Sequence, residues 1–432
     1  MKHIKLLIIC YLMVPAFLSG QNKLTLDLEG AKKHALEHNM SLINAGLAIS
    51  KSELAVREAI ANGLPQVNAS ADYSNALGAD ITIQFVPEAP PAVIPIKPQS
   101  NLYVNVGQLL FSGNYLVGIQ TAKLYNDLSV KNRQKTELEV MTQVSDAYYL
   151  VMVSKELLDI MKMNVENLNE LYEKMQAMEA VGVIESLDVD QLQVQVNTMQ
   201  NAVKSSERQL ELATNLLRLQ LGEGVDTEIE LTENLSALMA AAGFEGILLK
   251  NFDLNGNIDY QMMQQQVLIS EKMVNMQKAN ALPTLSAFYR YTYKLLKPDF
   301  DMTPPNMLGL QMNIPIFSSG VRTYQVRQAE IGLETARNQQ EFVSDQLRIQ
   351  EKQLRYNYVS ALETWQNQQT NIEVARRVYN NLKLKYEQGM ISGLDLVNAD
   401  NNYLRAETDY ISSMMQVLST RVQLEKLYGE LK

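Results

Sequence analysis

The most regular pattern along the chain is helical. Two segments carry apolar residues at alternating spacings of four and three, which is typical of helices that pack side by side in a coiled coil. The longer stripe consists of Leu192, Val196, Met199, Val203, Ser206, Leu210, Ala213 and Leu217. The other consists of Met161, Val165, Leu168, Tyr172 and Met175. Helices in the core of a compact bundle would give the same spacing, so length must separate the two interpretations.

The positions of the prolines show where long helices can run. No proline stands between Pro98 and Pro283, and none follows Pro315. Because proline costs about 3 kcal/mol inside a helix, these gaps permit helices of unusual length. A helix over residues 115–181 would be about 100 Å long at a rise of 1.5 Å per residue. A compact domain does not need such a helix, so we predict extended helical hairpins.

Four segments alternate apolar and polar residues with period two, which predicts strands with one apolar face. They flank two proline-rich segments, residues 78–100 and 296–306, which we interpret as irregular loops. We expect strands of about 10–13 residues that form two hairpins. Their apolar positions are Val67, Ala69, Ala71 and Tyr73; Leu102, Val104 and Val106; Leu285, Ala287, Tyr289, Tyr291 and Tyr293; and Leu308, Leu310, Met312, Ile314 and Ile316.

The chain consists of two similar halves. Leu64-Pro65 recurs as Leu282-Pro283, and from Gly113 onward equivalent residues lie 207 positions apart. The equivalent pairs include Gly113 and Gly320, Tyr149 and Tyr356, Tyr172 and Tyr379, Gly182 and Gly389, Asp188 and Asp395, and Gly222 and Gly429. A repeat of this length without a net insertion indicates rigid helices rather than loops.

Each half is predicted to contain a helix, two strands, a long helix, a tight turn and a shorter helix. In the first half the first helix covers about 27–63 and the last about 187–221, so the two can pack end to end along the long helix. We divide the chain into a first structural repeat, 21–222, a linker or equatorial segment, 223–257, and a second repeat, 258–432.

The N-terminus has the pattern of a secretory signal peptide. Lys2 and Lys5 precede an apolar run over residues 6–14, and we expect cleavage after residue 20. The run is too short to span a membrane as a helix. Cys10 lies inside this run, after the bulky Ile9, which disfavours a lipoprotein signal. The remaining chain is therefore expected to be exported.

Composition removes several classes of function. Asp and Glu outnumber Lys and Arg by 48 to 38, and an acidic chain is a poor partner for nucleic acid, whose binding depends on neutralising phosphates. Without the signal peptide no cysteine remains, which excludes disulfides, thiolate chemistry and cysteine-bearing zinc sites. His34 and His38 lie one helical turn apart, and we interpret them as a solvated helix face rather than a metal site. We expect no catalytic residue, metal or cofactor.

Four amphipathic strands cannot close a barrel in lipid, because an open edge there leaves backbone groups unsatisfied. Three chains would supply twelve strands, an even number within the range of outer-membrane barrels. The tyrosines on the apolar faces suit the membrane interface. The alternative is a soluble periplasmic protein whose strand hairpins cap a helical bundle, and which would be a monomer without lipid.

Several short motifs occur in a fixed order along the chain, and those after the opening motif occur once in each half. They are Leu24-Thr25-Leu26 with Ala31, Ala35, Leu36 and Asn39; the two Leu-Pro pairs before the strands; Gln108, Leu110, Phe111 and Gly113; Ile314, Pro315, Ile316, Phe317 and Gly320; and the turns from Gly182 to Asp188 and from Gly389 to Asp395. In this order they resemble the TolC-type outer-membrane efflux channel family. The resemblance implies a mainly α-helical protein with a transmembrane β-barrel. A homotrimer would share a twelve-stranded β-barrel, four strands per chain, and a long coiled-coil α-helical barrel.

The resemblance also implies a location and partners. The protein would lie in the outer membrane, in contact with its lipid, with a long periplasmic portion. It would be the passive exit duct of a tripartite efflux or type I secretion system and not an enzyme. Its partners would be a periplasmic adaptor (membrane fusion) protein and an inner-membrane pump, with no nucleic acid. Drugs, metals, other small molecules and polypeptides all stay open as cargo, because the pump selects it.

The two tight turns are the candidate docking surface. Gly182 and Gly389 follow long helices and can adopt a positive φ, and Asp188 and Asp395 can cap the next helix or lie near its start. By resemblance, these turns form the periplasmic mouth and bind the adaptor. The candidate docking residues are Gly182, Val183, Ile184, Ser186, Leu187, Gly389, Met390, Ile391, Ser392 and Leu394. We expect Val183, Ile184, Met390 and Ile391 to be exposed, which suits a partner surface.

The resemblance places a gate beside these turns, with Asp188, Tyr386, Asp395 and Asn398 as candidates. Asp395 matches the first acid of the family's constricting ring, whereas Asn398 stands where the family has a second acid. Asp188 and Tyr386 match one closing pair, but Ile391 replaces its arginine partner. We therefore expect a gate with less charge and fewer salt bridges. Three copies of Asp395 around a narrow axis would favour cations, and a solvated helix-start aspartate is the alternative.

Overall fold

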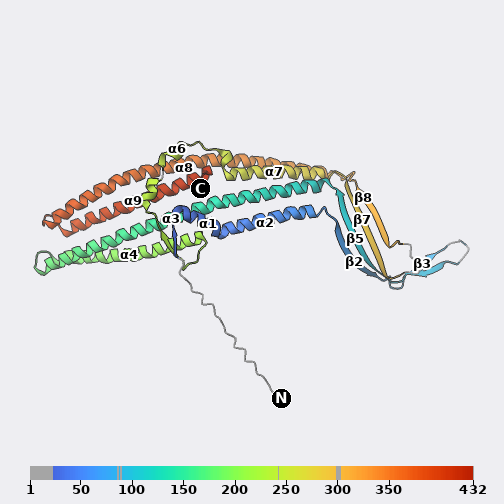
Figure 1. The fold of residues 1–432 in the computed structure, drawn as a ribbon, viewed down its shortest axis with the longest axis horizontal. Helices are drawn as coiled ribbons and strands as arrows, with labels where there is room; N and C mark the ends of the chain where they lie inside the picture. The colour runs from blue at the N-terminus through green and yellow to red at the C-terminus, as the bar shows by residue number, and fades with distance from the viewer. Residues whose placement is uncertain (1–22, 85–86, 88–89, 242, 298–302, 432) are drawn as a thin grey trace, which may run out of the picture.

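The structure is a computed structural model that describes residues 23–84, 87, 90–241, 243–297 and 303–431 (Figure 1). The predicted signal peptide lies outside these residues. The molecule is elongated, with a four-stranded sheet at one end and two long helical hairpins at the other (Figure 1). None of the helices within the described residues combines the length and the apolar content that a membrane crossing requires.

Two very long helices run through the molecule, as predicted. They are α3 (Gly113–Ala180), with 68 residues, and α8 (Val321–Glu387), with 67 residues. Each turns back into a helix of 36 residues, α4 (Ser186–Leu221) after α3 and α9 (Gly393–Tyr428) after α8. At 1.5 Å per residue the long helices measure about 100 Å, which confirms the extended hairpins predicted from the proline gaps.

The first helix of the chain is broken, so the prediction of one helix over 27–63 is wrong. The segment forms α1 (Leu28–His38) and α2 (Met40–Ala61), with Asn39 in an extended conformation between them. The Asn39 side chain accepts a hydrogen bond from the Ser41 backbone N–H and donates one to the Gln220 carbonyl. Asparagine is a strong helix N-cap, and this bond to a distant carbonyl adds to the preference for a break.

The same junction recurs in the second half. Asn257 caps α7 (Ile258–Ala279), and its side chain donates to the carbonyl of Leu427, which is the repeat equivalent of Gln220. Gly222 and Gly429 end α4 and α9 in the left-handed conformation, with φ of +77° and +70°. Thus α2 and α4 lie end to end along α3, and α7 and α9 lie end to end along α8, as predicted.

The four predicted strands form one antiparallel sheet in the order β2-β5-β7-β8. The strands are β2 (Gln66–Ser74), β5 (Gln99–Phe111), β7 (Thr284–Leu296) and β8 (Asn306–Asn313). The outer two, with 9 and 8 residues, are shorter than we expected. The central pair joins the two halves, with Val104 opposite Tyr291. Within the described residues, β2 and β8 each have one edge without a partner strand.

The first proline-rich segment is not wholly irregular, which corrects the sequence prediction for residues 78–100. It contains β3 (Asp80–Ile83) and β4 (Ala92–Pro95), which pair as a separate antiparallel ribbon beyond the main sheet (Figure 1). β-Branched residues favour strands, and both segments contain them: Ile81, Thr82 and Ile83 in β3, and Val93 and Ile94 in β4. In the second proline-rich segment, residues 298–302 lie outside the described part of the chain.

Short elements surround the middle of the long helices. They are β1 (Lys23–Leu26), which pairs in parallel with β6 (Glu228–Leu231), and α5 (Leu235–Ala241), α6 (Phe244–Leu248) and the 3₁₀ turn η1 (Leu254–Gly256). The largest apolar cluster lies at this level, and Tyr148 and Tyr358 are fully buried in it. The predicted division of the chain at residues 223 and 257 stays a prediction.

A second apolar cluster, here called the tip cluster, lies near the turns. Its members are Leu168, Leu171, Met175, Val189, Leu192, Val196, Met199, Leu396 and Val397. The stripe predicted on α4 is confirmed, since most of its residues are buried. On α3 the buried face is shifted from the predicted one, because Met161, Val165 and Tyr172 are only half-buried. Because α3 packs against both α4 and α9, it buries a wider face than a single coiled-coil seam.

Candidate functional site

Both tight turns lie at the end of the molecule opposite to the sheet (Figure 1). Gly182 and Gly389 adopt φ of +76° and +71°, which confirms the predicted left-handed conformation. No atom lies within 4 Å of the position that a Cβ would occupy at either glycine. The backbone conformation, and not a lack of space, therefore explains why glycine stands at both turns.

The helices that follow the two turns begin differently. At α9, Ser392 Oγ accepts from the Asp395 backbone N–H, and Asp395 Oδ2 accepts from the Ser392 N–H and hydroxyl at 3.1 and 2.7 Å. This is a complete capping box, and the Asp395 carboxylate also lies at the positive end of the helix dipole. At α4, Glu185 occupies the equivalent cap position without a side-chain cap bond. Asp188 lies in the first turn of α4 without this capping role.

Asp395 and Asn398 lie together at the surface. Both line a hollow of about 600 Å³ between α8 and α9, with Val378 and Leu382 of α8 on its other side. Both side chains are exposed, so the charge of Asp395 is available to ions that pass this face. The structure therefore brings these two candidate gate residues together.

Asp188 and Tyr386 lie on different helices of one protomer, α4 and α8. Tyr386 lies in the last turn of α8 and packs against the tip cluster, and burial raises the pKa of its hydroxyl. Asp188 is half-buried at the start of α4. The described residues of one chain show no hydrogen bond between the two side chains.

The candidate docking residues are mostly exposed. Val183 and Met390 expose 63% and 67% of their surface. Leu187, Leu394, Ser186 and Ser392 are exposed as well. The expectation of full exposure is wrong for Ile184 and Ile391, which are half-buried. Ile184 packs against the tip cluster, and Ile391 lines the hollow beside Asp395.

Sequence reasoning missed a buried polar pair near the tip. Asp400 of α9 accepts a hydrogen bond from Asn164 Nδ2 of α3, and both residues are almost fully buried. Asp400 also lines a cavity of about 660 Å³ between α3 and the α8–α9 hairpin. Burial raises the pKa of its carboxyl, and the bond from Asn164 offsets part of this effect. The sequence did contain a signal for this pair. Asp400 follows Leu396 and Val397 at helical spacing, which places its carboxyl on the apolar face of the helix.

The two histidines form a local contact. Their rings stack at 4.2 Å, and His34 Nε2 lies 2.8 Å from Glu223 Oε1. The contact between His34 and Glu223 connects α1 to the segment just after the end of α4. Within the part of the chain that the structure describes, no three His, Cys, Asp or Glu side chains are grouped so that they could hold a metal.

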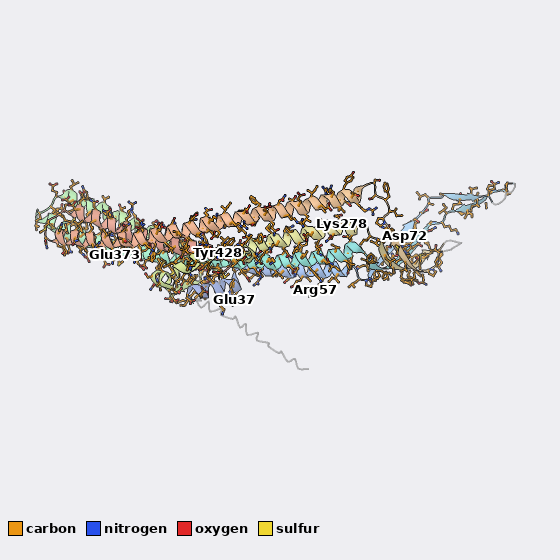
Figure 2. The ribbon with its side chains drawn as sticks, turned by 90° about the horizontal axis from the view of Figure 1, so that it is seen from above. Glu37, Arg57, Asp72, Lys278, Glu373 and Tyr428 are labelled. Atoms are coloured by element: carbon orange, nitrogen blue, oxygen red, sulfur yellow. The ribbon has the colours of Figure 1, made fainter. Side chains whose placement is uncertain are left out.

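The two long sides of the molecule carry exposed apolar stripes. Figure 2 shows α8 and α2 on opposite sides, with α7, which bears Lys278, between them. The α8 stripe consists of Tyr324, Ile331, Phe342, Ile349 and Tyr356. The opposite stripe consists of Met40, Ile43, Leu47 and Leu54 of α2 and Leu212, Leu216 and Leu219 of α4. Both stripes have the spacing of helix-packing seams, yet they are exposed among the residues that the structure describes.

Exposed apolar side chains also cover one face of the sheet. They include Val67, Tyr73, Tyr291, Tyr293, Leu308, Leu310 and Met312. Contiguous exposed apolar surface of this kind marks contact with a membrane or a partner.

Comparison with known proteins gives consistent results. The family model of outer membrane efflux proteins matches residues 32–223 and 253–430. The antibiotic efflux pump outer membrane protein ArpC and the toluene efflux pump outer membrane protein TtgC, both of Pseudomonas putida, are each 22% identical over 314 residues. The match covers 70% of this chain and 62% of each relative, less than two thirds of their length. The solved structure of the outer membrane protein VceC from Vibrio cholerae superposes with a TM-score of 0.73 at 16% identity, over 93% of this chain and 96% of that one.

Proposed function

Since this chain belongs to the outer membrane efflux protein family, we propose that it is the outer-membrane exit duct of a tripartite efflux or type I secretion system. One observation carries this proposal: an amphipathic sheet with an apolar exposed face is attached to helices about 100 Å long. The sheet would cross the outer membrane, and the helices would extend through the periplasm. The duct itself performs no catalysis, and transport through it is passive.

We propose a homotrimer, because the two sides of one chain are complementary. The free edge of β2 and the stripe on α2 and α4 lie on one side, while the free edge of β8 and the α8 stripe lie on the other. Contacts between unlike sides generate a ring when the rotation closes. Three chains would pair the sheet edges into a barrel of twelve strands and cover the apolar stripes.

The first test is the native mass of the full-length protein extracted from outer membranes in a mild detergent. We expect a species of about three times the chain mass of 48.7 kDa, because both sheet edges need a partner in lipid. Recovery as a soluble monomer would remove the barrel and would favour the periplasmic coiled-coil protein instead.

We propose that the tips form a gate that opens when the adaptor binds the exposed turns and the periplasmic helix ends move outward. Because one protomer does not join Asp188 to Tyr386, their pairing would form between helix pairs in the closed trimer. We expect Asp188→Ala and Tyr386→Phe each to raise single-channel conductance in planar bilayers. Asp190→Ala, at an exposed acid on the same helix, is the control and should behave as wild type. Unchanged conductance in both gate variants would count against the pairing.

We also propose that the inner-membrane pump selects the cargo. The two Pseudomonas putida relatives are equally similar to this chain, yet one is named for antibiotics and the other for toluene. A wide duct exposes passing molecules mainly to solvated surface, so the choice between such molecules would fall to the pump.

A further inference from the structure

Two carboxyl groups form hydrogen bonds that join α3 to α9. The two links differ in whether every buried polar atom has a hydrogen-bond partner. Ser419 donates a hydrogen bond to Asp146, and Asn164 donates one to Asp400. The two links lie about five helical turns apart on α3, and the Asp400 link is the one near the tip. A hydroxyl donor suits an ionised carboxylate, so the Asp146 link is complete in its charged form.

The Asp400 link is incomplete in its charged form. Asp400 and Asn164 expose only 5% and 6% of their surface, and Asn164 Oδ1 is buried without a hydrogen-bond partner. An ionised carboxylate only accepts hydrogen bonds, so it cannot satisfy this amide oxygen. A protonated carboxyl has the missing donor, and together with the amide it can form two hydrogen bonds instead of one.

We propose that Asp400 and Asn164 form a proton-dependent latch that holds the α8–α9 hairpin against α3. With the proton bound, the Asp400 hydroxyl donates to Asn164 Oδ1 while Asn164 Nδ2 donates to the other carboxyl oxygen. Loss of the proton removes the first bond and leaves a charge in the buried contact, which weakens the contact between the helices. The role in gating rests on the proposed function, whereas the pairing itself does not.

The surroundings of Asp400 favour the protonated form. The titratable groups that face it or line the same cavity are Tyr379, Lys383, Tyr386 and Glu387 of α8, Tyr403 and Glu407 of α9, and Glu170 and Lys174 of α3. Gln195 of α4 donates a hydrogen bond to Asn401, the residue next to Asp400. Burial is the main cause that raises the carboxyl pKa, and Glu407 adds to it. The Asn164 bond and Lys383 oppose it, and the net direction is upward.

The direction of the pH effect follows from this raised pKa. The latched contact is fully present below the ordinary aspartate pKa of about 4 and is lost as pH rises through the higher pKa of the folded state. Acid therefore closes the tip, and a rise toward neutral pH loosens it.

The test compares wild type with Asp400→Asn, whose side-chain amide keeps a donor at every pH. In detergent, the thermal midpoint of Asp400→Asn should exceed that of wild type at about pH 8, and the difference should shrink as the pH falls toward about 4. Asp409→Asn, at an exposed aspartate on the same helix, is the control and should follow wild type. If Asp400→Asn keeps the full pH dependence of wild type, the latch is wrong.

Planar bilayers test the link to gating. Wild type should spend more time open at about pH 8 than at about pH 4, while Asp400→Asn should stay mostly closed at both. Asn164→Ala should be more open at both, because the carboxyl then has no partner. Equal pH dependence in wild type and Asp400→Asn would overturn the gating role. If wild type forms no channel at all, the proposed function fails, and the thermal comparison still decides the latch.

Discussion

Gly222→Ala is expected to prevent the accumulation of folded protein, and with it of the proposed trimer. The new Cβ would lie 2.2 Å from the carbonyl oxygen of His38, a backbone atom that cannot move without displacing the junction between α1 and α2. The residue also has a φ of +77°, which costs a non-glycine residue about 1–2 kcal/mol. Relief of the overlap adds about 1–3 kcal/mol per chain, so the total approaches the stability of many domains. Trimer yield and thermal midpoint after extraction measure the effect.

The second half of the chain provides a matched comparison. Gly429 has a φ of +70°, but its Cβ would lie 3.2 Å from the nearest backbone atom, the Gly256 oxygen. Gly429→Ala should therefore cost little more than the left-handed conformation itself. Gly224→Ala should be close to wild type, because nothing lies within 4 Å of its Cβ position. Equal losses in all three variants would show that the contact with His38 is not the cause.

If the chain forms the proposed trimer, Ile349→Asp is expected to convert it into monomers. Ile349 lies in the middle of the exposed stripe on α8, which the proposed trimer buries against α2 and α4 of the next chain. A buried charge without a partner costs several kcal/mol, and each trimer would contain three of them. The native mass in mild detergent measures the outcome.

Two further variants distinguish the interface from the fold of the chain. Ile349→Leu keeps an apolar side chain of equal volume and should remain trimeric. Leu54→Asp on α2 should dissociate the trimer as Ile349→Asp does, because it lies on the opposite stripe. A stable trimer in both aspartate variants would place the subunit contacts elsewhere on the chain.

The elements that sequence predicts well are those with a strong period over many residues. The α4 stripe repeats over about seven turns, and the four strands keep their alternation next to proline-rich loops. The internal repeat supports these predictions, since each element is observed twice. Long helices and the order of the elements therefore follow from local pattern alone.

The failures depend on contacts between distant segments. The break at Asn39 is stabilised by the Gln220 carbonyl, 181 positions away in the chain. The shifted stripe on α3 results from a second neighbour, α9, which a search for one seam does not consider. Asp400 and Asn164 are 236 positions apart in the sequence. Locally, the sequence shows only that each is a polar residue on an apolar helix face, and this does not identify its partner.

The candidate site divides in the same way. The turn glycines and the capping role of Asp395 depend on neighbouring residues, and they agree with the prediction. The proximity of Asp395 and Asn398, three residues apart on α9, follows from helical spacing, whereas the relation of Asp188 on α4 to Tyr386 on α8 depends on how whole helices are placed. Pairings between chains lie beyond both the sequence pattern and the single protomer, which is why conductance must test them.

The unequal caps of α4 and α9 have a consequence for symmetry. Each chain has two hairpin tips, so a trimer would present six. If the two repeats were identical, all six tips would be equivalent. Here Ser392 and Asp395 fix the start of α9, whereas Glu185 leaves the start of α4 without a side-chain cap. The mouth would then alternate three stiff tips with three that fray more easily. An adaptor that bound the proposed mouth would then meet two different kinds of binding position, which alternate around a threefold axis.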